Sequence, residues 1–121
     1  MLPPNGSLPQ GASLYVISPA DGQAVTSSVT VRFGARRVSV APAGTEAAST
    51  GHHRLIVDAP LPPLDQPIPA DEHYRHFGGG QTETTIELPP GEHTLQLLMG
   101  DYRHIPRTPT VASPRITIRV Q

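Results

Sequence analysis

The sequence predicts an all-β fold, an immunoglobulin-like antiparallel β-sandwich of about seven strands with two long loops. Short runs of residues alternate apolar and polar side chains, and turn sequences such as Asp-Gly and Pro-Pro-Gly separate them. Fifteen prolines and eleven glycines disfavour long helices. The 121 residues suffice for one domain with one hydrophobic core. That core should be mainly aliphatic, because the chain has two phenylalanines, three tyrosines and no tryptophan.

The predicted elements follow in order along the chain. Residues 1–13 are rich in proline, glycine, serine and asparagine and should form a flexible linker, so that the folded domain spans residues 14–121. The alternating runs cover residues 14–17, 29–33, 53–57, 84–88, 93–99 and 116–120. Successive strand side chains point to opposite faces, so each run should have one buried and one wetter side. The long connections are residues 41–51 and 59–80, and loops of this length are often functional.

Composition excludes several classes of function. A formal net charge of −1 argues against a nucleic-acid partner, which would call for a basic surface. The chain has no cysteine, and no serine lies in a Gly-x-Ser-x-Gly elbow, so we expect a binding protein and not an enzyme. No apolar run of about 18 residues suggests a membrane span. The N-terminus lacks the regions of a signal peptide, and its linker-like composition favours a periplasmic or secreted protein whose signal has been removed.

All six histidines lie between residues 51 and 104, and imidazole is a common ligand of copper and zinc. Loops at one end of the sandwich could gather a metal site from His52, His53, His73, His76, Asp101 and His104. His52 and His53 are adjacent and face opposite ways inside a strand, a restriction that relaxes only at the strand's start. His73 and His76 converge only if they share a helical turn. His93 begins a strand after Pro-Gly-Glu and should pin a corner instead.

A second interpretation rests on arginine. Guanidinium groups beside the histidines would repel a metal cation, but they bind carboxylates and phosphates bidentately. Glycines permit close approach of a ligand to the backbone. An anionic ligand or an envelope protein partner would then contact Arg54, Arg75, Gly78, Gly79, Gly80, Gln81 and Arg103. Two further interpretations stay open: the histidines serve only as surface hydrogen-bonding groups, or the domain is purely structural.

Four segments of the chain resemble the bacterial family called domain of unknown function 4399. They are Gly51-His52-His53-Arg54-Leu55-Ile56-Val57-Asp58, Pro67-Ile68-Pro69-Ala70-Asp71, His76-Phe77-Gly78-Gly79-Gly80-Gln81-Thr82-Glu83 and Pro90-Gly91-Glu92-His93-Thr94-Leu95-Gln96-Leu97-Leu98. The resemblance spans residues 14–120 and implies an exported protein. In the family a third histidine usually stands at Arg54, and further histidines stand at or near Tyr102 and Arg107. The family histidines that correspond here are His52, His53, His76 and His104.

Overall fold

The structure is a computed structural model that describes residues 13–36, 39–40, 50–77, 82–100 and 111–121. Every regular element within these ranges is a β-strand, so the all-β prediction is confirmed. The strands are β1 (Ser13–Ser18), β2 (Ala24–Val25), β3 (Val29–Arg36), β4 (Ser39–Val40), β5 (Thr50–Val57), β6 (Tyr74–His76), β7 (Glu83–Ile86), β8 (Gly91–Gly100) and β9 (Ile116–Val120). All six predicted runs form strands, and the short strands β2, β4 and β6 were not predicted.

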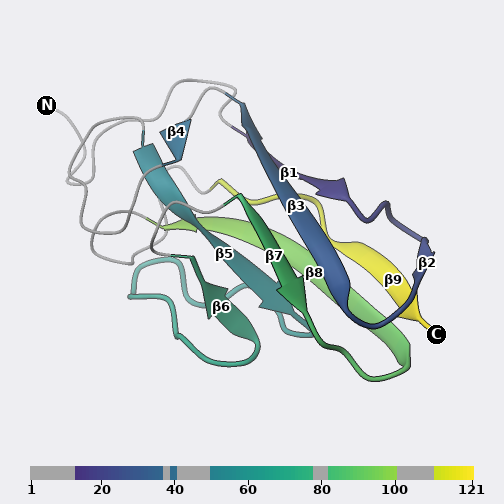
Figure 1. Ribbon diagram of the computed structural model, residues 1–121. Helices are drawn as coiled ribbons and strands as arrows, with labels where there is room; N and C mark the ends of the chain where they lie inside the picture. The colour runs from purple at the N-terminus through teal and green to yellow at the C-terminus, as the bar shows by residue number, and fades with distance from the viewer. Residues whose placement is uncertain (1–12, 37–38, 41–49, 78–81, 101–110) are drawn as a thin grey trace, which may run out of the picture.

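The strands form two sheets that lie one on the other (Figure 1). The smaller sheet has the order β1-β3-β7, with both pairs antiparallel. The larger sheet has the order β2-β9-β8-β5-β4, and β6 also pairs with β5. Its centre is antiparallel, whereas β2 and β4 add parallel pairs at its borders. The two-sheet β-sandwich is therefore confirmed, and the immunoglobulin-like assignment stays a prediction.

The core is aliphatic, as predicted, and it fills the space between the two sheets. In β3 the apolar residues Val29, Val31 and Phe33 are buried, whereas the intervening Thr30 and Arg32 are exposed. The facing sheet contributes apolar side chains from three strands, namely Leu55, Val57, Leu95, Leu97, Met99, Ile118 and Val120. Burial of one such side chain stabilises the fold by roughly 1.5–3 kcal/mol. Period-two alternation therefore does select the face of each strand that packs inward.

Strands β5 and β8 differ from this rule because they are buried on both faces. Their outer face carries Ile56 and Leu98, which pack with Ile68 from the connection after β5. Tyr74 of β6 also packs against this cluster, and its hydroxyl donates a 2.8 Å hydrogen bond to the Pro60 carbonyl. The expectation of one wetter side was thus wrong for these two strands, because part of the long 59–80 connection covers them.

Candidate functional site

Strand β5 carries the adjacent histidines, and its pairing decides on which face each lies. His52 pairs with Gly100 of β8, and His53 pairs with Met99. Both positions therefore lie inside the paired part of the strand and on opposite faces of the sheet. The relaxation expected at a strand's start does not apply, so the two cannot join one mononuclear site. Position 52 lies on the outer face and position 53 on the core face.

His53 lies in the hydrophobic core with 0% of its surface exposed. Its ring packs against Phe33 of the other sheet, with 5.0 Å between the ring centroids. Neither ring nitrogen has a hydrogen-bond partner among the residues that the structure describes. Because burial disfavours the imidazolium form, the pKa of His53 falls from 6.5 to about 4. At neutral pH the ring is therefore uncharged, and both of its nitrogens are enclosed by the fold.

Arg54 lies on the outer face, and it is almost completely buried, with 1% of its surface exposed. Its Nη1 donates a 2.9 Å hydrogen bond to the carbonyl of Pro69 in the connection that covers this face. Burial also lowers the pKa of Arg54. This guanidinium, which the sequence suggested as a contact for an anionic partner, instead ties the covering segment to β5.

His73 and His76 are placed apart by strand β6. His76 pairs with Arg54, so it shares the outer face with Arg54 and with position 52. His73 lies in the bend before the strand, where its backbone carbonyl accepts a hydrogen bond from Val57 N at 2.7 Å. Its Nδ1 lies 2.9 Å from the Val57 carbonyl oxygen. Since residues 74–76 are extended, the helical turn that would have brought the two rings together does not form.

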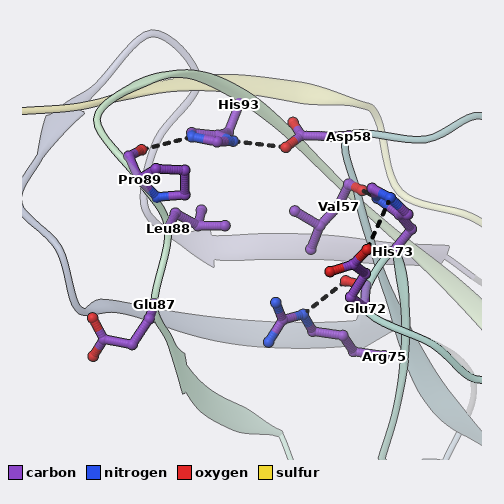
Figure 2. A pocket seen from close by; sticks show the side chains of 9 residues that line it. All are labelled: Val57, Asp58, Glu72, His73, Arg75, Glu87, Leu88, Pro89 and His93. Carbon is purple, nitrogen blue, oxygen red and sulfur yellow. Dashed lines mark hydrogen bonds and ion pairs between the residues drawn. The ribbon is translucent and has the colours of Figure 1, made fainter.

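A cavity of about 210 Å³ opens beside the end of β5, and Figure 2 shows the side chains around it. Position 52 lies five residues back along the strand, roughly 17 Å away at the rise of an extended chain. This cavity therefore lies at the other end of β5 from the histidine pair. Its lining combines an apolar part with six charged or titratable groups: Val57, Asp58, Glu72, His73, Arg75, Glu87, Leu88, Pro89 and His93.

His93 is held between two acceptors at this cavity (Figure 2). Its Nδ1 lies 2.6 Å from Asp58 Oδ2, and its Nε2 lies 2.8 Å from the Pro89 carbonyl oxygen. A carboxylate and a carbonyl can only accept, so satisfying both contacts requires a hydrogen on each ring nitrogen, which makes His93 an imidazolium. Burial alone would lower the pKa of His93, but the hydrogen bonds and charge of Asp58, with the Pro89 carbonyl, raise it. The expected corner-pinning role of His93 is confirmed.

Asp58 is the residue of this site that sequence reasoning missed. It follows β5 directly and has φ +56°, a left-handed conformation that aspartate tolerates better than most residues. Its Oδ1 accepts a 2.8 Å hydrogen bond from Thr94 N, while its Oδ2 contacts His93. The sequence did show an Asp-Ala-Pro turn after one strand and a histidine at the start of another. Local sequence patterns cannot show, however, that two residues 35 positions apart are in contact.

Several predicted site residues lie outside the described part of the chain, and their positions are not assigned. These are Gly78, Gly79, Gly80, Gln81, Asp101, Arg103 and His104. Among the described residues, no three His, Asp or Glu side chains are grouped so that they could hold a metal ion. Within the described chain, no helix is both long and apolar enough to cross a membrane.

The His93 contacts predict a specific response to Asp58→Asn. The amide oxygen can still accept from Thr94 N, but the amide nitrogen would donate to Nδ1, so His93 would become neutral and its pKa would fall. Because the native pKa is raised, the stabilisation is complete below the unfolded value of about 6.5 and is lost as pH rises through the folded pKa. Loss of the charged hydrogen bond should cost about 1.5–3 kcal/mol at pH 6. NMR titration and urea unfolding measure both effects; an unchanged His93 pKa in the variant would contradict the assignment.

His53 predicts the opposite dependence on pH in metal-free buffer. Above pH 6.5 the His53 ring is neutral in both the folded and the unfolded state, so its titration does not change the free energy of unfolding. Between 6.5 and about 4 only the unfolded state takes up the proton, so stability should fall by about 3 kcal/mol, at 1.36 kcal/mol per pKa unit. His53→Leu should remove this part of the acid sensitivity in urea unfolding across pH 4–7. An equally steep decline in the variant would assign the sensitivity to other groups.

Comparison with known proteins identifies a family but no characterised relative. The family model described as Domain of unknown function (DUF4399) matches residues 31–121, about three quarters of the chain. No curated protein and no solved structure matches the sequence. The match includes most of β3 and all later strands, and with them both β5 and the cavity at its end. The chain belongs to the DUF4399 family.

Proposed function

We propose that this protein is a non-catalytic metal-binding module of the bacterial cell envelope, periplasmic or secreted. It coordinates copper or zinc on the outer face of the β5–β6–β8 sheet through His52 and His76, with Asp101 and His104 completing the ligand set. The observation that supports this proposal is the backbone register, which pairs His52 with Gly100 and Arg54 with His76. These pairs place positions 52, 76 and 100 around one patch of the sheet.

The register makes positions 52 and 76 diagonal neighbours on one face. Diagonal positions on adjacent antiparallel strands are about 7–8 Å apart, which long side chains can bridge. Asp101 follows Gly100 directly in the chain, and Gly100 is the partner of His52 in the ladder. Two imidazoles with one or two further donors form a typical zinc or copper ligand set.

The positive charge of Arg54 would repel a metal cation on this face, since Arg54 lies between positions 52 and 56 and pairs with His76. A carboxylate in the ligand set offsets that charge, which is why Asp101 belongs to the proposal. His73 does not, because it lies beside Val57 at the far end of the strand. His53 is also excluded, because it lies on the core face.

Metal titration by calorimetry tests the outer-face site. We expect binding of Zn²⁺ or Cu²⁺ at pH 7.5 and weaker binding at pH 5.5, because the ligands must be neutral imidazoles. His76→Ala should reduce the affinity by about tenfold or more, by analogy with the effect of losing groups around a metal. His73→Ala is the matched control and should bind as the wild type does. Dissociation constants weaker than about 1 mM, near −4 kcal/mol, would remove the proposal.

The cavity at the end of β5 supports a second candidate function, binding of a small carboxylate. Arg75 Nε donates to the Glu72 carbonyl at 3.1 Å, which fixes the side chain while its guanidinium points into the cavity (Figure 2). Val57, Leu88 and Pro89 supply an apolar surface. Since Glu72 and Glu87 also line the cavity, the best ligand would carry a positive group as well, as a neutral amino acid does.

This candidate predicts that a neutral amino acid shifts the NMR signals of residues around Arg75, with weaker binding at high salt because screening reduces charge attraction. Arg75→Gln should abolish the shifts, since an amide cannot replace the bidentate contact of a guanidinium with a carboxylate. Arg119→Gln, on an exposed position of β9, serves as the control. Equal shifts in Arg75→Gln and the wild type would eliminate this role for the cavity.

A further inference from the structure

The core-face histidine has an unusual environment for a polar group. Both nitrogens of His53 are buried, and within the described part of the chain neither has a hydrogen-bond partner. An unsatisfied buried polar atom typically costs about 1–3 kcal/mol, and native structures rarely retain one without a reason such as a redox role or a bound ion. An aliphatic residue of similar size would fill the same space at no such cost. The imidazole therefore points to a ligand that the fold encloses.

The atoms next to this ring identify the chemistry of that ligand. Met99 pairs directly with His53 across the β5–β8 ladder, so both side chains project to the same core face about 4.5–5.5 Å apart at Cβ. Met99 is fully buried, and its thioether is a soft metal donor. Phe33 contacts the imidazole, and Phe77 packs on Phe33 with 5.3 Å between their ring centroids. Two neutral donors thus lie within an aromatic and aliphatic enclosure.

We propose that His53 and Met99 form a Cu(I) site within the core, separate from the outer-face site. A thioether with an imidazole suits soft Cu(I), whereas Zn²⁺ and Cu²⁺ prefer harder or more numerous donors. Neither donor carries a negative charge to offset that of the ion. Burying an uncompensated divalent charge costs more free energy than burying a monovalent one, so the site favours a monovalent ion. The pair is the second from the His52–Gly100 end of the ladder, so fraying of that end gives the ion a route inward.

The core site does not depend on the outer-face proposal, because adjacent strand positions serve opposite faces of the sheet. His76 lies on the outer face and should not influence Cu(I) in the core. Conversely, Met99 lies on the core face and should not influence Zn²⁺ outside it. One set of variants can therefore separate failure of either site from failure of the other.

The test is an anaerobic titration of the whole chain with Cu(I) against a chromogenic Cu(I) chelator, followed by X-ray absorption spectroscopy at one equivalent. Met99→Leu conserves volume and removes only the donor. It should weaken Cu(I) binding by about 100-fold, the upper range for groups that merely support a metal ligand. The copper–sulfur scattering of the wild type should also disappear. Met1 is present in both proteins, so only the signal that depends on Met99 counts.

His53→Leu should produce the same loss, and His76→Ala should leave the core affinity for Cu(I) unchanged. Urea unfolding checks that each variant is folded. If His53→Leu does not fold, Met99→Leu still tests the proposal. Copper–sulfur scattering that vanishes in Met99→Leu while Zn²⁺ binding persists would support the core site alone. A wild-type spectrum without sulfur scattering, or equal Cu(I) affinities in the wild type and Met99→Leu, would overturn it.

Discussion

The pairing of β5 with β8 is the constraint on which the rest of the structure depends. Six consecutive residue pairs, from His52–Gly100 to Val57–Leu95, join these strands. The ladder supplies core side chains on one face and a second apolar cluster on the other. A shift of the register by one residue would move His53 to the outer face and position 52 into the core. Both proposed metal sites follow from this single alignment.

Two histidines show how environment assigns opposite states to one residue type. His53 is enclosed by Phe33 and other apolar groups, so its neutral form is favoured. His93 is partly buried, but Asp58 and the Pro89 carbonyl accept from both of its nitrogens and favour the imidazolium. Burial opposes charge in both cases. The difference is that, among the described residues, acceptors compensate for burial at His93 and none does at His53.

Arg54 of β5 and Arg75 of β6 also lie in different environments. Arg54 is enclosed beneath the connection after β5 and binds the Pro69 carbonyl, so it stabilises the cover of the outer face. Arg75 is adjacent to His76, the partner of Arg54, and it pairs with Leu55, so it lies on the opposite face of the sheet and its guanidinium reaches the cavity. From the sequence both were equally good candidates for contacting an anionic ligand, because each stands beside a histidine. Their environments differ because Arg54 pairs with His76 while Arg75 pairs with Leu55, so the two side chains lie on opposite faces of the sheet.

The sequence by itself determined the all-β class, the six principal strands and the inward faces of runs such as 29–33, because alternation and turn residues act over a few positions. It also identified the family and, from the Pro-Gly-Glu turn, predicted that His93 lies at a corner. Only the tertiary structure decided that His53 lies in the core, that His73 and His76 separate, and that Asp58 holds His93. These outcomes depend on strand register and on the segment that covers β5, which join residues 16 to 46 positions apart. Local patterns carry no information about such long-range contacts, so no reading of spacing alone could assign them.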